Sequence, residues 1–443
     1  MFSAQDPMSF LRIKASVLHG AKDLRVESRT IRAPNPGELQ IAIQSTGLCG
    51  SDLHYYNHFR NGDIQCLEPL TLGHESAGVV VDVGSAVNEP QGKGKRKAES
   101  SQNGEEGWKI GDKVALEVGL PCGICDLCLS ERYNICPDLK FRSSAKGYPH
   151  AQGTLQERIN HPKEWCHKLP SSLPPEIGAL LEPLGVAIHA SRRAALKEGA
   201  TILIFGAGAV GLLVAAVMKV ERTAAKIVIA DIDAGRVDFA IENGFADQGY
   251  IVKKKTSQDI TKELENAKST AEEIGDLVGS GSKNNATLVD AVFECTGVPS
   301  SLQSAFYVCL SLYSFAFDAD QIKQATRPGG KIMLIGMGTP IQTLPISAAA
   351  LREVDIIGVF RYANTYPKGI ELLARMLATE NSTTISMKKM PDIRKLITHR
   401  FQGFDRIEDA FKMAGKTVDG DGNLVIKVVT DFNGLMVGEG AKL

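Results

Sequence analysis

Four cysteines lie close together in the segment GLPCGICDLCLSERYNIC: Cys122, Cys125, Cys128 and Cys136. The chain has nine cysteines and begins without the charged and apolar blocks of a secretion signal, so we expect free thiols rather than disulfides. Four thiolates at this spacing can surround one tetrahedral Zn2+ and cross-link a loop that lacks its own core. Because no coordination position stays open, we predict a structural zinc in a lobe spanning residues 119–140.

A second set of residue types that bind metals is spread over three segments. The first segment offers Cys49, Ser51, His54 and Tyr55, the second offers His74 and Glu75, and the third offers Glu182 and His189. Cys49, His74 and a carboxylate fit a catalytic zinc that keeps one position for water or substrate. Such a zinc would polarise an alcohol, and the alkoxide would transfer hydride to a nicotinamide. Four further residues of these types are interpreted as packing residues: His189, Cys66, Cys166 and Cys295.

The stretch ILIFGAGAVGLLVAA carries the spacing G-x-G-x-x-G at Gly206, Gly208 and Gly211. It follows a strand pattern and opens a helical pattern, which is the context of a dinucleotide site. The glycines permit a tight turn and close approach of a pyrophosphate, which the helix N-terminus would face. Asp231 ends the next strand pattern and would bind the ribose hydroxyls and repel a 2′-phosphate, so NAD is favoured over NADP. Arg236 is interpreted as packing beside the adenine or ribose.

Two kinds of scaffold must position these residues. The first ~185 residues are rich in short strand-like runs and in Gly/Pro turns. From about residue 199, apolar strands alternate with helical patterns at 209–220, 234–243, 258–268 and 299–307, which indicates a parallel sheet covered by helices. We therefore predict an α/β protein with a β-rich catalytic zinc domain at 1–190, a doubly wound NAD-binding Rossmann domain at 191–354, and a return to the catalytic domain at 355–443.

Composition narrows the classes of partner. The net charge is −1, so no basic field exists to attract nucleic acid or an anionic membrane. No run of ~18 apolar residues is present, so we expect no membrane span. Residues 88–107 are polar and of low complexity, and we predict a mobile surface loop there. The alternative, a tract that binds acidic partners, is disfavoured by the glutamates within it.

In combination, the motifs resemble those of one family. The order GLCGSDLHYY, GHESAGVV, the four-cysteine lobe, LLEPLGVAIH, GAGAVG and REVDIIGVFRYANTYP resembles the zinc-dependent medium-chain dehydrogenases over roughly residues 18–429. Within them it is most similar to the polyol branch, sorbitol dehydrogenase and its fungal relatives that act on xylitol or L-arabinitol. The resemblance implies a GroES-like catalytic domain, zinc- and NAD-dependent oxidation of a polyol to the ketose, and a homotetramer. The complete four-cysteine site indicates the fungal side of the branch.

The resemblance also implies residue roles. Cys49, His74 and Glu75 would hold the catalytic zinc with water as fourth ligand, and Glu182 would hold that water or become a ligand itself. Ser51 and His54 would pass the proton outward. The polyol hydroxyls would contact Tyr55, Glu182, Arg361 and Tyr362. NAD would be contacted by the three glycines and by Val210, Asp231, Arg236, Ile335, Gly336, Met337, Val359, Phe360 and Arg361.

The segment 308–324 is anomalous, because deleting it leaves the expected helix, turn and strand. We interpret it as a retained intron. It motivates an alternative function, a catalytically impaired NAD-binding homologue. A zinc enzyme for simple alcohols is a further alternative, but Glu182 and Arg361 disfavour it because such an enzyme requires an apolar pocket.

The last three residues bear on location. Ala441, Lys442 and Leu443 resemble a relaxed form of the peroxisomal Ser-Lys-Leu signal. The residues before them are not basic, so we predict a cytoplasmic protein, with the peroxisome as the alternative.

Overall fold

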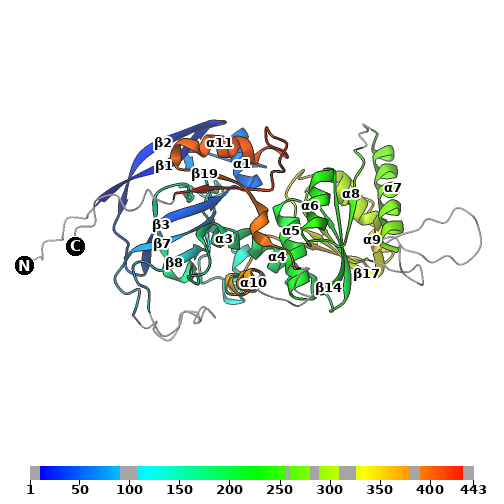
Figure 1. Cartoon of the computed structure of the whole chain (residues 1–443), viewed down its shortest axis with the longest axis horizontal. Helices are drawn as coiled ribbons and strands as arrows, with labels where there is room; N and C mark the ends of the chain where they lie inside the picture. The colour runs from blue at the N-terminus through cyan, green and yellow to red at the C-terminus, as the bar shows by residue number, and fades with distance from the viewer. Residues whose placement is uncertain are drawn as a thin grey trace, which may run out of the picture. The chain divides into compact units, whose positions relative to one another are not determined.

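The computed structural model describes residues 10–89, 107–254, 257, 259–279, 289–308, 326–378 and 390–432. The chain forms two compact units. Unit 1 comprises Met1–Pro183, Ala363–Ala374 and Arg394–Leu443, and unit 2 comprises Leu184–Tyr362 and Arg375–Ile393. Most of the predicted loop 88–107, all of 309–324 and the tail from 433 onward lie outside the described residues. Figure 1 shows the elements of both units.

Unit 1 is built on a seven-stranded sheet in the order β12-β8-β7-β3-β20-β19, with β11 also paired to β3. Its strands are β3 (Glu38–Gly47), β7 (Glu75–Val83), β8 (Lys113–Leu116), β11 (Arg158–Pro162), β12 (Cys166–Lys168), β19 (Ile397–Gln402) and β20 (Lys427–Asp431). A second sheet has the order β2-β1-β6, with β1 (Phe10–Gly20), β2 (Asp23–Arg32) and β6 (Leu70–Thr71). Two short pairs complete the strands: β4 (Arg60–Asn61) with β5 (Ile64–Gln65), and β9 (Gly119–Leu120) with β10 (Lys140–Phe141).

The helices of unit 1 are short. Among the described residues they are α1 (Gly50–His58), α2 (Asp126–Leu129), α3 (Pro175–Ala179), α11 (Ile407–Ala414) and the 3-10 turns Tyr133–Ile135, Lys163–Trp165 and Phe404–Arg406. A further 3-10 turn, Ile393–Leu396, begins at the last residue of unit 2. Helices α1 and α11 lie side by side, and the rings of Tyr56 and Phe411 join them at a centroid distance of 4.9 Å (Figure 1). This contact connects the helix that follows Cys49 to the C-terminal part of the unit.

The central strands of unit 1 approach each other closely. Apolar residues of β3 such as Ile41 and Ile43 are fully buried and belong to the main core of the unit. At Gly78 of β7 a Cβ atom would lie 2.1 Å from the carbonyl oxygen of Ala42, so only glycine fits between the two strands. The pairing of β3 with β7 fixes where Glu75, the first residue of β7, lies.

Unit 2 contains the predicted doubly wound sheet. Its six strands have the order β15-β14-β13-β16-β17-β18, and all of the pairs are parallel. The strands are β13 (Ala200–Phe205), β14 (Ala224–Asp231), β15 (Gln248–Ile251), β16 (Val289–Glu294), β17 (Thr326–Leu334) and β18 (Asp355–Gly358). This is the Rossmann strand order, and the predicted α/β class with a parallel-sheet domain is confirmed.

Helices α5 to α9 lie around this sheet (green to yellow in Figure 1). Their bounds are α5 (Ala209–Val220), α6 (Ala234–Glu242), α7 (Ile260–Gly279), α8 (Pro299–Val308) and α9 (Ile346–Ala350). Two further helices, α4 (Leu181–Ala194) and α10 (Tyr366–Ala378), contain residues of both units. Helix α7 extends well beyond the predicted 258–268, because buried positions continue at helical spacing as far as Val278.

The anomalous segment connects a helix to a strand. Helix α8 ends at Val308, and β17 begins at Thr326. In doubly wound parallel sheets, dinucleotides bind at the edge formed by the carboxyl ends of the strands. The strands start at the opposite edge. The described ends of the segment therefore lie at the far edge of the sheet from the predicted cofactor site.

Candidate active site and metal centres

Three predicted zinc ligands from two separate segments lie together in unit 1. Cys49 precedes the first turn of α1, His74 precedes β7, and Glu75 begins that strand. Their ligand atoms all lie within 4.8 Å of one another. His74 is 4% exposed and Glu75 is 1% exposed. A thiolate, an imidazole and a carboxylate that converge in this way form the donor set of a zinc site that keeps one position open, so the residues fit a catalytic zinc.

Glu75 also has a cationic partner that the sequence analysis missed. Lys427, the first residue of β20, is 4% exposed, and its Nζ donates to Oε1 and Oε2 of Glu75 at 2.8 and 2.7 Å. The same Nζ donates to the carbonyl oxygen of Leu48 at 3.1 Å. Burial alone would lower the pKa of Lys427, but the negative charges of Glu75, Cys49 and Glu182 together outweigh burial and raise this pKa. The available signal was a single lysine inside the apolar run NLVIKVV.

The position of Glu75 depends on the glycine opposite it. Strands β3 and β7 pair Gly47 with Glu75. A Cβ atom at Gly47 would lie 2.2 Å from Oε2 of Glu75. The missing side chain at this position therefore makes the room in which the carboxylate lies.

Asp52 orients His74. Its Oδ1 lies 3.2 Å from Nδ1 of His74 and accepts hydrogen bonds from the N–H of Gly73 at 3.1 Å and the hydroxyl of Ser143 at 2.8 Å. Its Oδ2 accepts the N–H of Cys49 at 3.2 Å. Because Nδ1 of His74 faces this carboxylate, Nε2 is the nitrogen available to a metal. Burial opposes the charged form of His74, but Asp52 and Cys49 together outweigh burial and raise the pKa of His74 well above its usual value.

The other predicted residues of this site are not members of the group of three ligand atoms. Glu182, in the first turn of α4, is 6% exposed and interacts electrostatically with Lys427, yet it does not join the group of three ligand atoms. Ser51 is half-buried and His54 is exposed, both on α1. Tyr55 is buried, and its hydroxyl accepts the N–H of Ala145 at 3.1 Å.

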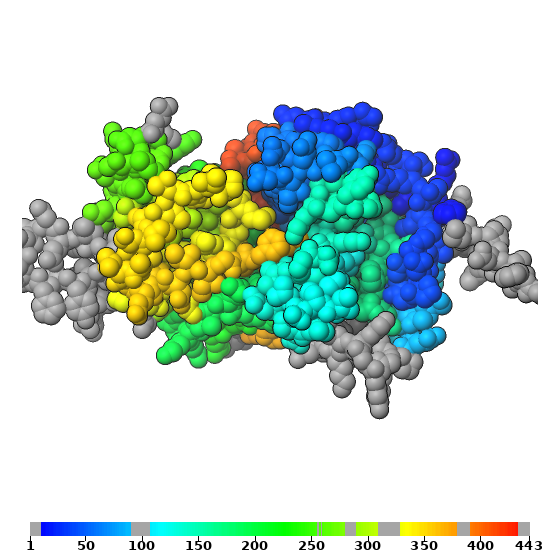
Figure 2. Space-filling model, turned by 180° about the vertical axis from the view of Figure 1, so that it is seen from behind, coloured from blue at the N-terminus to red at the C-terminus, as the bar shows by residue number. Residues whose placement is uncertain are grey.

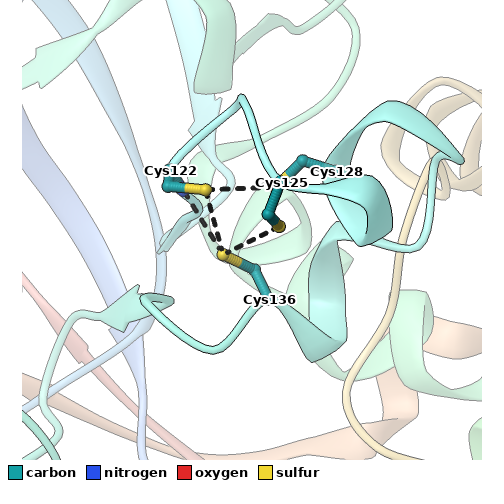
Figure 3. Close-up of side chains that lie close together, drawn as sticks. All are labelled: Cys122, Cys125, Cys128 and Cys136. Carbon is teal, nitrogen blue, oxygen red and sulfur yellow. Dashed lines mark hydrogen bonds between the residues drawn. The ribbon is translucent and has the colours of Figure 1, made fainter.

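The four cysteines of the lobe converge (Figure 3). Their sulfur atoms all lie within 4.8 Å of one another, with Cys122 and Cys136 3.6 Å apart. The N–H groups of Ile124 and Cys125 stabilise the thiolate and lower the pKa of Cys122 to about 7. Four sulfur atoms at these distances fit a tetrahedral zinc without an open position. The lobe lies at the molecular surface, where Ile124 is 81% exposed (cyan in Figure 2).

A buried polar network anchors the lobe to the sheet of unit 1. Tyr133, which lies between the third and fourth cysteines, donates its hydroxyl hydrogen to Oε1 of Glu117 at 2.5 Å. The other oxygen of Glu117 lies 2.8 Å from Nε2 of His167. The hydroxyl of Tyr133 also accepts the N–H of Asn364 at 2.6 Å. This network could not be predicted from the sequence, because its members are far apart in the chain.

The predicted dinucleotide turn connects β13 and α5 in unit 2. Gly206 has a φ of +100°, and a Cβ atom at Gly211 would lie 1.9 Å from the carbonyl oxygen of Gly206, so both positions require glycine. Gly208 is the N-cap residue of α5. Asp231 ends β14 and accepts the N–H of Ala207 at 2.7 Å. A Cβ atom added to Gly208 would lie 3.8 Å from Nη1 of Arg236, so this guanidinium is close to the turn. These features fit a bound dinucleotide.

The remaining predicted cofactor and substrate residues of unit 2 lie in three places. Val210 is in the first turn of α5, Ile335, Gly336 and Met337 follow β17, and Val359, Phe360, Arg361 and Tyr362 follow β18. Met337 is 65% exposed. The guanidinium of Arg361 lies 4.9 Å from the centroid of the Phe360 ring, and Arg361 has a φ of +51°. Residues after β17 and β18 thus lie at the carboxyl ends of neighbouring strands, where dinucleotides bind.

Comparison with known proteins agrees with this architecture. Residues 35–171 match the family described as the alcohol dehydrogenase GroES-like domain. The chain is 35% identical over 408 residues to sorbitol dehydrogenase of Gallus gallus, covering 92% of this chain and 94% of the relative. It is also 35% identical over 420 residues to sorbitol dehydrogenase of Arabidopsis thaliana, covering 94% of each chain.

Solved structures show the same fold. L-idonate 5-dehydrogenase from Escherichia coli superimposes with a TM-score of 0.71 at 24% identity, covering 96% of this chain and 100% of that chain. A 2R,3R-butanediol dehydrogenase from Bacillus subtilis superimposes with a TM-score of 0.65 at 26% identity, covering 95% and 100%. The arrangement of a GroES-like domain with a Rossmann domain is therefore established for this chain.

Proposed function

The chain belongs to the sorbitol dehydrogenase family of zinc-dependent medium-chain dehydrogenases, and on that basis we propose that it oxidises a polyol to the ketose with NAD as hydride acceptor. The observation that carries the proposal is the convergence of Cys49, His74 and Glu75 in a chain that also has a dinucleotide turn. A bound zinc would polarise the substrate oxygen and favour its deprotonated form, and a bound NAD would accept the hydride.

The residues of unit 1 prepare this chemistry. Cys49, His74 and Glu75 would hold the metal, and the Asp52 carboxylate 3.2 Å from Nδ1 of His74 would favour Nε2 as the nitrogen that binds it. Ser51 and His54 are three residues apart on α1, one half-buried and the other exposed. They are our candidates for carrying the substrate proton outward. Glu182 is our candidate for holding a water or replacing a ligand, and nearby Lys427 would stabilise its charge.

We assign polyol recognition to Tyr55, Glu182, Arg361 and Tyr362. A polyol needs hydroxyl and charged partners to replace the water that it loses on binding. A guanidinium, a carboxylate and phenol hydroxyls supply both donors and acceptors for neighbouring hydroxyl groups. An enzyme for simple alcohols would bind its substrate with apolar side chains instead, so these four residues favour a polyol. The assignment to the fungal side of the branch stays a prediction.

NAD is the proposed cofactor form because of Asp231. Its carboxylate lies at the end of β14 and already accepts main-chain N–H groups of Ala207 and Asp233. The remaining lone pairs would accept the adenosine ribose hydroxyls, and the negative charge would repel a 2′-phosphate. We accordingly assign NAD binding to unit 2 and zinc chemistry to unit 1.

A homotetramer is our proposal for the assembly. Strand β18 forms one edge of the six-stranded sheet, and Ile356 on it is 42% exposed. Close by in the chain, Ile341 and Leu351 are 88% and 85% exposed. An open strand edge beside exposed apolar side chains favours association with a second copy. Sedimentation of the purified chain as a monomer would contradict this proposal.

We propose a cytoplasmic location, with the peroxisome as the alternative. None of the helices in the described ranges combines the length and hydropathy needed to cross a bilayer. The terminal Ala441-Lys442-Leu443 lies outside the described residues. A fluorescent fusion with and without Leu443 distinguishes the two locations, because only a peroxisomal protein would change its distribution.

The test of the proposed function is a polyol panel. Zinc-replete protein is assayed with sorbitol, xylitol and L-arabinitol, with NAD or NADP, and with ethanol as the simple-alcohol control. We expect NADH formation with at least one polyol, loss of activity after chelation and recovery on adding zinc. NAD binding without turnover on any polyol would instead favour the catalytically impaired homologue.

A further inference from the structure

We propose that Glu294 is a positioning residue for the cofactor: its buried carboxylate holds the turn after β16, which packs against the dinucleotide turn and the turn after β17, and thereby sets the affinity for NAD. The inference rests on the proposed NAD-dependent function and goes beyond it, because Glu294 is outside the dinucleotide motif and none of the assigned contacts includes it.

Glu294 lies where the strand order of the sheet reverses. It is the last residue of β16, and the register pairs it with Phe205 of β13 and Leu334 of β17. Those two residues directly precede Gly206 of the dinucleotide turn and Ile335 of the proposed cofactor contacts. In doubly wound sheets dinucleotides bind outside the carboxyl ends of the strands at this reversal. Glu294 is therefore at the base of the cofactor site.

Both ends of Glu294 hold a turn. Its carboxylate accepts the N–H of Thr296 at 2.8 Å and the N–H of Gly297 at 3.0 Å, and the hydroxyl of Thr296 also donates to it. Its main-chain carbonyl oxygen accepts the N–H groups of Ile335 and Gly336 at 3.0 and 2.9 Å. A single residue thus connects the turn after β16 to the turn after β17 by hydrogen bonds to both.

The two turns leave no space between them. A Cβ atom on Gly336 would lie 2.8 Å from Oε2 of Glu294 and 2.1 Å from the nitrogen of Gly297. On the other side, Cγ2 of Thr296 lies 2.9 Å from the position of a Cβ atom on Gly206. Because neither glycine has room for a Cβ atom, the turn after β16 packs directly against the dinucleotide turn and Gly336, and a shift of Thr296 or Gly297 toward either one would displace it.

The carboxylate of Glu294 is buried among neutral hydrogen-bond donors. The side chain is 2% exposed, and in the described part of the chain its hydrogen-bond donors are neutral N–H and O–H groups. Burying a carboxylate without a cation costs free energy, which raises the pKa of Glu294. A neutral side chain could fill the same volume with a smaller desolvation penalty. We therefore infer that the role of the carboxylate is to accept hydrogen bonds from several donors of one turn at once.

The test is Glu294→Gln in the full, zinc-replete chain, with NADH affinity measured by fluorescence titration. The amide keeps the shape, but its NH2 group would face N–H donors and push the turn away. We expect the Kd for NADH to rise about tenfold, with zinc content unchanged and with polyol KM at saturating NAD unchanged.

Asp290→Asn is the matched control. Asp290 lies near the opposite end of the same strand, and its Oδ2 accepts the N–H of Thr201 at 2.8 Å. This variant removes a carboxylate that also caps a backbone N–H of the sheet, so we expect a lower Tm with the Kd for NADH within twofold of wild type. Equal Tm losses in both variants with an unchanged Kd in Glu294→Gln would overturn the inference.

Two further variants keep the inference testable if Glu294→Gln does not fold. Glu294→Asp retains the charge but shortens the side chain, and Thr296→Val removes one donor of the turn. We expect each to raise the Kd for NADH severalfold, and a wild-type Kd in both would overturn the inference. Wild-type protein that binds NADH but oxidises no polyol would contradict the proposed function. The NADH titration of the Glu294 and Thr296 variants would still test the inference in that case.

Discussion

Lys427 and Glu75 form a buried ion pair at the candidate catalytic centre, with Nζ 2.7 and 2.8 Å from the two carboxylate oxygens. The two residues are 352 positions apart in the chain. Glu75 is also one of the three residues whose possible ligand atoms converge, so the lysine and a bound zinc ion would share one carboxylate. The lysine supplies positive charge to Glu75 whether or not zinc is bound.

Lys427→Met should make the stability of the protein more dependent on zinc. Without lysine or metal, the buried Glu75 has lost its ion-pair partner, and breaking such a pair costs about 3–5 kcal/mol. With zinc bound, the metal supplies the missing charge and the loss should be smaller. Urea unfolding with and without a chelator measures both values. Lys427→Arg keeps the pair and serves as control, and equal losses in both metal states would contradict the interpretation.

Asp52→Asn should weaken binding of the catalytic zinc. The change removes the negative charge 3.2 Å from Nδ1 of His74, and outer carboxylates of this kind typically contribute about 10–100-fold to metal affinity. Competition with a chromophoric chelator measures the effect. Asp63→Asn, whose side chain is 96% exposed, removes the same charge from the surface and should leave zinc affinity unchanged. A wild-type affinity in Asp52→Asn would show that the contact does not tune the site.

Cys125→Ser should lower the zinc content from two ions to one per chain. The hydroxyl is a much poorer zinc ligand than a thiolate, and the lobe gains its stability from the metal. We expect a lower Tm and full NADH binding, because the turn in unit 2 does not include the lobe. Metal analysis by mass spectrometry measures the stoichiometry. Cys66→Ala is the control, because Cys66 is outside both ligand groups, and it should retain two zinc ions.

Asp231→Ser should reduce the preference for NAD. The variant loses the charge that would repel a 2′-phosphate and loses the acceptor for the N–H of Ala207. A hydrogen bond to a charged group contributes about 1.5–3 kcal/mol. Its loss should lower kcat/KM for NAD by about 10–100-fold. Relative activity with NADP should rise. Asp238 is exposed on α6, so Asp238→Asn should change neither kcat/KM for NAD nor the relative activity with NADP. An unchanged NAD to NADP ratio would reject the assignment of Asp231.

His161 should make the folded protein less stable in acid. The ring is fully buried in β11, with Nδ1 3.1 Å from Nε of Arg142, and burial together with Arg142 holds the pKa of His161 well below its usual 6.5. Below pH 6.5 the unfolded chain therefore binds a proton at this residue that the folded chain does not. Its contribution to stability is fully present above that pH and decreases as pH falls, by up to about 1.4 kcal/mol per pH unit.

Urea unfolding between pH 7.5 and 5.5 measures this dependence. His161→Gln cannot titrate, so its free energy of unfolding should change less steeply with pH than that of wild type, although its stability is lower throughout. Parallel pH profiles would show that another group causes the acid sensitivity.

Features that depend on short stretches of chain could be predicted from the sequence. The cysteine spacing, the G-x-G-x-x-G turn with Asp231, and the alternation of apolar strands with helices are each encoded within about 30 residues. Their physical basis is local, because a tight turn, a metal loop and an amphipathic period need no distant partner. For that reason the parallel sheet agreed with the expectation, whereas α7 proved longer than the segment quoted for it.

The partners of the charged groups were decided by the tertiary structure alone. Lys427 meets Glu75 because β20 and β7 both flank β3, and Glu294 reaches two turns because β13, β16 and β17 end in register. Strand order and register arise from packing of the whole sheet, and residue spacing along the chain does not specify them. The sequence alone therefore determined which chemistry the chain can carry, while the fold decided which buried side chains stabilise the ligands and hold the cofactor turns.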